Sequence, residues 1–140
     1  MRLFVYGTLR QGCPNHRLLF GSRYLGPATT AEPYVMVTQK SRSFPYIFKH
    51  PDLYTTPIRG EMYEINQETV RQLDALEGHP DHYRRQQILV TTPKGDAYAC
   101  AAYLLEDASM IHDINESLGT AFVFVPNGDW TDKHATVSKE

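Results

Sequence analysis

The stretch FVYGTLRQGCPNH, residues 4–16, ends a strand-forming segment in a glycine turn close to the N-terminus. Residues 4–6 are apolar or aromatic and favour extended backbone, whereas Gly7 and Thr8 interrupt the run. Glycine is typical of positions where the chain turns sharply or where a ligand approaches the backbone closely. The stretch therefore predicts a first strand over residues 2–6, followed by a candidate binding turn.

The composition of the chain indicates a globular protein. Its 140 residues are 41% hydrophobic and 21% charged, with a formal net charge of −2, which suits one domain over residues 1–140 and argues against a nucleic-acid-binding surface. No apolar run reaches the roughly 20 residues of a membrane span, and the N-terminus lacks the apolar core of a signal peptide. The cysteines, Cys13 and Cys100, are too few for a disulfide framework. We therefore expect a cytoplasmic protein that binds neither nucleic acid nor membranes, with a frayed tail at 134–140.

The remaining elements follow from apolar periodicity and breaker residues. A helix is predicted over 67–77, because good helix formers follow Asn66 as N-cap and Gly78 stops them. A short helix is expected after Pro14, and a short apolar segment with a turn over 121–130. Strands without regular βαβ alternation favour a mixed α+β domain. The predicted strands after the first are 33–39, 44–50, 58–65, 83–92 and 97–106.

Three patterns that carry chemistry in other proteins are incomplete here. The glycine spacing of residues 7–12 matches a phosphate-binding P-loop, but the lysine that reaches the phosphates is missing. Cys13 and His16, and His79 and His82, have metal-ligand spacings, yet the loop chemistry around each pair favours a structural or surface role. Cys13 paired with a histidine could act as a nucleophile, but no third orienting group is identifiable. We therefore expect neither nucleotide nor metal.

Glu77 departs from the pattern of its predicted helix. At about 100° per residue it falls on the apolar side marked by Val70 and Leu73, in the last turn, where the helix dipole disfavours a negative charge. Both effects raise the pKa of a carboxyl group, and residues that break local rules are often functional. The alternative is that Glu77 bends outward and pairs with Arg84 or Arg85. The spacing alone leaves both interpretations open.

The sequence VYGTLRQGCPNH, taken with LDALEGHPDHYRR, resembles the γ-glutamylcyclotransferase-like superfamily. Members carry a Tyr-Gly-Thr/Ser-Leu loop after the first strand and a catalytic glutamate in an LxxxEG segment. The resemblance extends to GEMYEI, AYLL and GDW, and so spans most of the chain. The segment after the loop is most like the γ-glutamylamine cyclotransferase branch, although Cys13 stands where a glutamine is expected. Residues 21–57 match no motif and are expected to help set specificity for the leaving group.

This resemblance implies a fold and a site. The fold is a small, mainly antiparallel β-barrel with flanking helices. The loop wraps the glutamyl α-carboxylate and α-amine, where a turn can present successive backbone N–H groups to a carboxylate. Glu77 is the general acid and base, and no metal or cofactor is implied. The expected substrate-binding residues are Tyr6, Gly7, Thr8 and Leu9, with Tyr83 and Tyr103 as pocket walls or hydrogen-bond donors.

The implied reaction needs no protein nucleophile. The α-amine of a γ-glutamyl compound attacks its own γ-carbonyl, which closes a five-membered ring and releases 5-oxoproline and an amine. The expected substrate is a γ-glutamylamine, with γ-glutamyl-ε-lysine as the leading case.

Three alternatives stay open: a cyclotransferase acting on γ-glutamyl amino acids, glutathione or another γ-glutamyl metabolite, a non-catalytic protein that binds a small carboxylate, and an amidase that uses Cys13. The presence of Glu77 argues against a protein that only binds, because such a protein would not need a buried base.

We expect a monomer or weak dimer. We also expect Arg10, Gln11 and Asp74 to tolerate substitution, because they lie past the loop or further round the helix.

Overall fold

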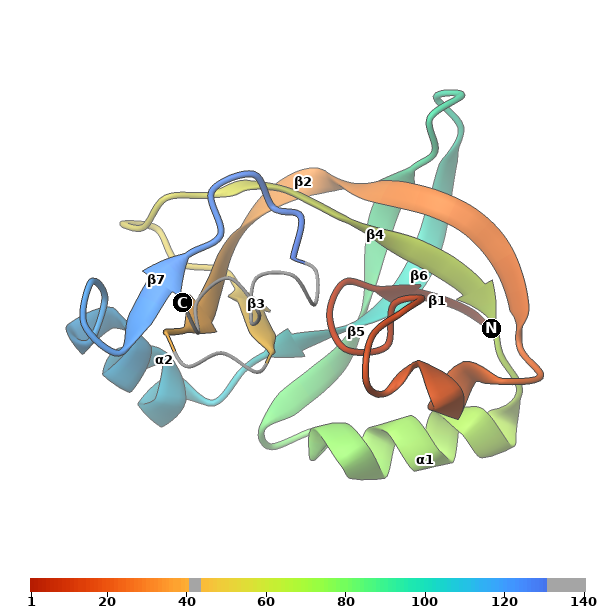
Figure 1. Cartoon of the computed structure of the whole chain (residues 1–140), viewed down its shortest axis with the longest axis horizontal. Coiled ribbons are helices and arrows are strands. Elements are labelled where there is room, and N and C mark those ends of the chain that lie inside the picture. Colours follow the sequence, from red (N-terminus) through yellow and green to blue (C-terminus); the bar gives the residue numbers. More distant parts are fainter. Residues whose placement is uncertain (41–43, 131–140) are drawn as a thin grey trace.

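The computed structural model describes residues 1–40 and 44–130, and its centre is a closed ring of strands. The ring runs β2-β4-β1-β6-β5, and β5 pairs back onto β2 to close it. Every pairing in the ring is antiparallel except that of β1 with β6, which is parallel. The expected mainly antiparallel barrel with flanking helices is confirmed (Figure 1). The ring strands are β1 (Arg2–Val5), β2 (Arg23–Gln39), β4 (Thr56–Glu64), β5 (Tyr83–Thr91) and β6 (Ala97–Leu105).

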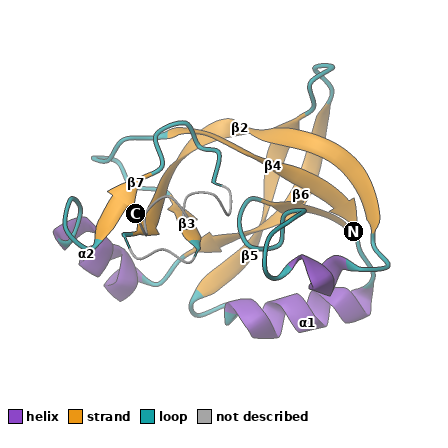
Figure 2. Ribbon diagram, viewed as in Figure 1, coloured by secondary structure: helices purple, strands orange, loops and turns teal. Residues whose placement is uncertain are grey.

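Helices and two short strands surround this barrel. The 3-10 helix η1 (His16–Leu19) and the helix α1 (Gln67–Glu77) lie together on one side, and the helix α2 (Ala108–Glu116) lies at the other end, near β7 (Figure 2). The strands β3 (Pro45–Phe48) and β7 (Phe122–Phe124) both pair with the second half of β2. No helix in the described part of the chain is long and apolar enough to cross a membrane.

The long strand β2 differs most from the sequence prediction, which begins only at residue 33. Its first half pairs with β4 and β5, and its second half pairs with β3 and β7. The register shifts between Tyr24 and Gly26 and again between Thr29 and Pro33. Bulges of this kind let a strand bend and accommodate glycine and proline, residues that otherwise indicate a loop. The helix α2 was also not predicted, and the expected frayed tail lies outside the described residues.

The helix α1 forms where its sequence predicts. The Asn66 side chain accepts a hydrogen bond from the Thr69 N–H at 2.9 Å, and Gly78 ends the helix in the left-handed region at φ 67°. Val70 and Leu73 are buried against a core that includes Leu3 and other residues on the same side of the sheet. This packing, rather than helix propensity, fixes where the last turn of α1 sits.

A second core fills the barrel itself. Each of the five ring strands contributes to it, so the barrel interior is packed with side chains. Gly60 of β4 lies at its tightest point. A Cβ atom there would overlap the carbonyl oxygen of Val5 and stand 2.8 Å from the Phe4 ring. The close approach of β1 and β4 therefore requires glycine at this position.

Gly60→Ala should lower the free energy of unfolding by about 3 kcal/mol, because strands β1 and β4 must separate or the Phe4 ring must shift. Denaturant unfolding at equilibrium measures this difference. Arg59→Ala, an exposed position on the same strand, is the matched control and should change stability by less than about 0.5 kcal/mol. A Gly60→Ala protein as stable as the parent would contradict the packing constraint.

Candidate active site

A pocket opens at one end of the barrel, where β1 and β6 end and β5 begins. Its volume is about 270 Å³, and its wall is formed by the loop after β1, the last turn of α1 and the first residues of β3 and β5. All seven site residues predicted from the sequence line this pocket. They are Glu77, Tyr6, Gly7, Thr8, Leu9, Tyr83 and Tyr103.

Glu77 is the last residue of α1, and its carboxyl group lies in the pocket. Burial of this carboxyl group raises its pKa from 4.5 to about 7, although part of the residue surface stays exposed because the pocket is open on one side. The alternative ion pairs do not form: Arg85 lies 3.0 Å from Asp74, and Arg84 lies 3.8 Å from Glu106. Within residues 1–40 and 44–130 no cation pairs with Glu77. The outward-facing interpretation is therefore wrong.

The loop after β1 is held in a compact turn. The Arg10 N–H donates to the Gly7 carbonyl at 3.0 Å, and the Asn15 side chain donates to the Thr8 hydroxyl at 2.9 Å. The backbone N–H of Asn15 also donates to the Thr8 carbonyl at 2.8 Å. By contrast, the N–H groups of Gly7, Thr8 and Leu9 reach no acceptor within the described residues. Within residues 1–40 and 44–130, three successive backbone donors of this pocket-lining loop are therefore without an acceptor.

Close packing against Pro45 favours glycine at position 7, whether or not a ligand approaches the loop. A Cβ atom at Gly7 would stand 2.9 Å from Cδ and 3.0 Å from Cγ of Pro45. The glycine therefore lets the loop lie against the first residue of β3. Sequence reasoning offered only a sharp turn or a close approach by a ligand.

Three tyrosines enclose the carboxyl group of Glu77. Tyr6 donates its hydroxyl to the backbone carbonyl of Tyr103 at 2.6 Å, and burial, followed by the Glu77 charge, raises the Tyr6 pKa. The Tyr83 ring stacks on Tyr46 with 6.0 Å between centroids. Tyr103 donates its hydroxyl to Asp74 at 2.6 Å, so of its two expected roles the geometry favours that of a pocket wall over that of a donor to a ligand.

Asp74, which we expect to be replaceable, lies behind this wall and binds one of its tyrosines and an arginine of β5. Its carboxylate accepts the Tyr103 hydroxyl and forms two hydrogen bonds with the Arg85 guanidinium, at 3.0 and 3.2 Å. Burial of Asp74 raises its pKa, but the hydrogen bonds from Arg85 and Tyr103 outweigh this and lower it overall. The position of Asp74 around the helix does not predict these hydrogen bonds, because the partners come from β5 and β6.

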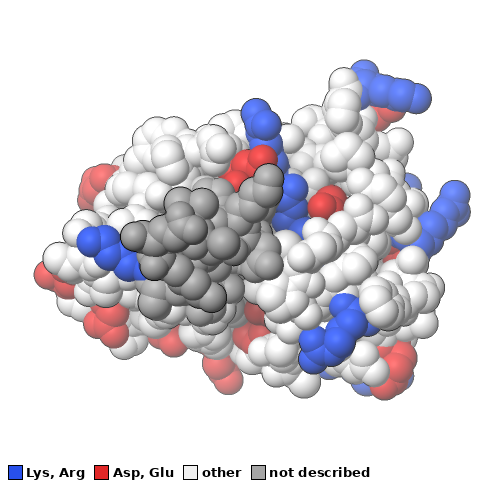
Figure 3. Space-filling model, in the orientation of Figure 1, with Lys and Arg blue, Asp and Glu red and all other residues white. Residues whose placement is uncertain are grey.

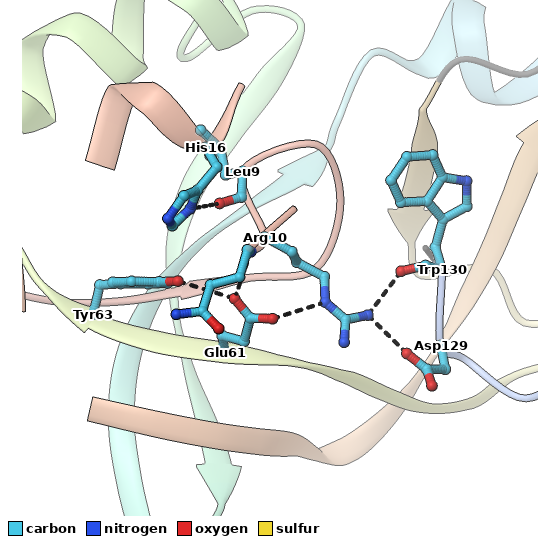
Figure 4. A network of polar contacts seen from close by, with 8 residues as sticks. Leu9, Arg10, His16, Glu61, Tyr63, Asp129 and Trp130 are labelled. Carbon is cyan, nitrogen blue, oxygen red and sulfur yellow. Dashed lines mark hydrogen bonds and ion pairs between the residues drawn. The ribbon is translucent and has the colours of Figure 1, made fainter. Parts of the chain in front are cut away.

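Arg10, which we expect to tolerate substitution, makes contacts that the sequence does not predict (Figure 4). Its guanidinium lies 3.3 Å from Glu61 and 2.7 Å from Asp129, and it donates to the Trp130 carbonyl at 2.7 Å. The backbone N–H of Gln11 donates to Glu61 at 3.0 Å. Arg10 therefore ties the loop to β4 and to the segment that follows β7.

Glu61 is the residue whose sequence position could have revealed this network. Its side chain is buried in β4, where a carboxylate needs a partner. Tyr63 also donates its hydroxyl to Glu61 at 3.0 Å.

On the face shown in Figure 3, basic and acidic side chains are interspersed rather than gathered by sign.

The paired histidines make separate contacts. His79 accepts the Arg85 N–H at 3.0 Å, His82 lies 3.5 Å from Asp107, and His16 contacts the Leu9 carbonyl at 3.0 Å. In the described ranges, no three His, Cys, Asp or Glu side chains are grouped so that they could hold a metal ion.

Comparisons with known proteins agree with this geometry. Residues 3–132 match the family model described as gamma-glutamyl cyclotransferase, AIG2-like. A relative from Methanocaldococcus jannaschii is 33% identical over 131 residues, which cover 93% of this chain and 95% of the relative. A Danio rerio protein named gamma-glutamylaminecyclotransferase C is 32% identical over 136 residues, or 94% of this chain and 80% of that protein. The crystal structure of a mouse AIG2-like protein superposes with a TM-score of 0.68 and 28% identity, over 76% of this chain and 77% of that one.

The buried carboxyl group of Glu77 and the loop after β1 thus line one pocket at the end of the barrel. The chain belongs to the gamma-glutamyl cyclotransferase, AIG2-like family, and the family and enzyme class expected from its motifs are confirmed.

The raised pKa of Glu77 should make the stability of the protein depend on pH. The folded state holds this proton more tightly than the unfolded state, so the contribution is complete below pH 4.5 and is lost as the pH rises through about 7. Relative to Glu77→Gln, the parent should lose about 2–3 kcal/mol of unfolding free energy between roughly pH 4 and pH 8. Denaturant unfolding across this range measures the difference. Parallel profiles for the two proteins would show that the carboxyl group is well hydrated.

Proposed function

We propose that this protein is a γ-glutamylamine cyclotransferase, which converts a γ-glutamylamine into 5-oxoproline and a free amine. One observation carries the proposal: the pocket is lined both by a desolvated carboxyl group and by a loop whose three successive backbone N–H groups reach no acceptor among the described residues. The donors suit an anionic end of a substrate, and the carboxyl group suits a proton transfer nearby.

The loop would bind the α-carboxylate of the glutamyl group. The N–H groups of Gly7, Thr8 and Leu9 supply hydrogen bonds without a cationic side chain. With that end fixed, the flexible glutamyl chain folds so that its α-amine approaches the γ-carbonyl. Positioning of this kind can contribute about 7–11 kcal/mol to lowering a barrier.

Glu77 would move the protons. Over the reaction two protons pass from the α-nitrogen to the leaving nitrogen, while the new C–N bond forms and the γ-amide C–N bond breaks. A carboxyl group with a pKa of about 7 can accept a proton from the α-ammonium and return it to the leaving amine near neutral pH. The ring-closing nucleophile belongs to the substrate, so neither cysteine takes part.

The mouth of the pocket favours an amine without a carboxylate beside the scissile bond. Leu76 is 50% exposed and Phe44 is 37% exposed there, next to Pro45. Among the described lining residues there is no lysine or arginine to pair with such a carboxylate. Phe44 and Pro45 lie within residues 21–57, which supports the proposed role of that region in leaving-group specificity. The γ-glutamylamine substrates, with γ-glutamyl-ε-lysine first, fit this surface better than γ-glutamyl α-amino acids.

The test is to offer γ-glutamyl-ε-lysine, γ-glutamyl-α-alanine and glutathione and to measure 5-oxoproline. The parent should prefer the first substrate, and Glu77→Gln should remain folded and lower kcat by at least about 100-fold. Cys13→Ser should keep most of the activity. Faster turnover of the α-amino acid compounds would overturn the leaving-group assignment. Near-parent turnover by Glu77→Gln, or an acyl adduct on Cys13, would overturn the mechanism.

Two substitutions separate the packing role of Gly7 from substrate binding. Gly7→Ala crowds Pro45, and Gly7→Ala combined with Pro45→Ala removes that crowding. If the substrate carboxylate approaches the loop, Gly7→Ala should raise KM about 10-fold both in the parent and in Pro45→Ala, because the added methyl group remains. Steady-state kinetics and thermal unfolding measured side by side make the distinction. A double variant with the KM of Pro45→Ala alone would show that Gly7 serves packing alone.

A further inference from the structure

An ion pair beside the pocket connects the helix that carries Glu77 with the wall opposite it. Asp74 lies one turn before Glu77 on α1 and receives the Tyr103 hydroxyl of β6 at 2.6 Å. Arg85 of β5 holds the same carboxylate through Nε and Nη2. The Asp74 side chain is 24% exposed and the Arg85 side chain is 28% exposed, so the pair is half-buried, and both partners of its hydrogen bonds are charged, which strengthens them.

Tyr103 also bonds to the other half of the site. Its backbone carbonyl accepts the hydroxyl of Tyr6, the residue from which the loop begins. The side chain of Tyr103 thus connects to α1, and its backbone connects to the loop. A continuous series of short hydrogen bonds runs from Asp74 through Tyr103 to Tyr6, between the helix that carries Glu77 and the proposed carboxylate-binding turn.

We propose that Asp74, held by Arg85, is a positioning residue that acts through Tyr103 to fix Glu77 relative to the loop at residues 6–9. The inference rests on the proposed function, since it assigns these contacts a role in that reaction. Because ring closure depends on the distance between reacting groups, a small shift of the last turn of α1 should reduce kcat more than it changes KM.

A second ion pair on the same helix serves as the comparison. Glu68 and Arg71 lie 2.7 Å apart, but their side chains are 63% and 68% exposed and make no contact with the pocket. Exposed pairs of this kind contribute little. Glu68→Ala is therefore the matched control for Asp74→Ala.

The test is a double-mutant cycle on 5-oxoproline release. Asp74→Ala and Tyr103→Phe should each lower kcat by about 10-fold, with KM within about threefold of the parent. The double variant should be no slower than Asp74→Ala, because Tyr103→Phe then removes a hydrogen bond that Asp74→Ala has already removed. Asp74→Asn, which keeps an acceptor for Tyr103, should recover part of the loss, and Glu68→Ala should match the parent. Additive losses, or unchanged kcat in the folded single variants, would overturn the proposal.

A second measurement needs no turnover. The groups facing Glu77 are Tyr6 of β1, Tyr83 of β5, Tyr103 of β6 and His82. Tyr103→Phe removes no charge, so a lower titration midpoint of the Glu77 carboxyl carbon by NMR would report hydration of a loosened helix end. Glu68→Ala should leave that midpoint unchanged.

The two readouts separate the proposals. If the parent releases no 5-oxoproline while Tyr103→Phe lowers the midpoint, the proposed function fails and the positioning role stands. If the parent is active but neither kcat nor the midpoint responds to Tyr103→Phe, only the positioning role fails. Folding of each variant is checked by thermal unfolding, and Asp74→Asn with Tyr103→Phe completes the test if Asp74→Ala does not fold.

Discussion

The parallel pairing of β1 with β6 is the constraint on which the site depends. Leu3 pairs with Ala101, so both strands run in the same direction and end at the same side of the barrel. The loop after β1 therefore meets the second half of β6, where Tyr103 lies. Because β5 is antiparallel to β6, its first residue, Tyr83, begins at this same end. The loop and two of the tyrosines are thus gathered by strand direction alone.

The helix α1 completes this arrangement and leaves the carboxyl group of Glu77 poorly hydrated. Its apolar face packs on the sheet and carries Glu77 to a position where the charged carboxylate is poorly solvated. An arginine next to it would restore the charged form, yet Arg85 is instead bound to Asp74. With that cation on a different carboxylate, burial leaves Glu77 with a pKa near neutrality, the value that the proposed proton transfer requires.

On its opposite side, the loop after β1 is held by the ion pairs of Arg10 rather than by apolar packing. Arg10 bridges Glu61 of β4 and Asp129, which lie far apart in the chain. Buried ion pairs contribute little net stability, but removing one partner leaves an uncompensated charge and is strongly destabilising. The pairs thus favour a single conformation of the loop. Asp129 and Trp130 belong to the GDW segment at 128–130. Their bonds to Arg10 connect this segment to the loop, although the two are remote in sequence.

By itself, the sequence determined the local features: the capped helix ending at Glu77, the turn after β1, and the motifs that indicate the family. These depend on residues within a few positions of each other, and so they can be read directly. Only the tertiary structure decided how far β2 extends, which carboxylate Arg85 binds, and which distant partners Asp74 and Arg10 bind. Each of these depends on contacts between residues distant in the chain. Whether Glu77 is buried without a cation or forms an ion pair depends on how α1 packs against β5, which no local pattern encodes.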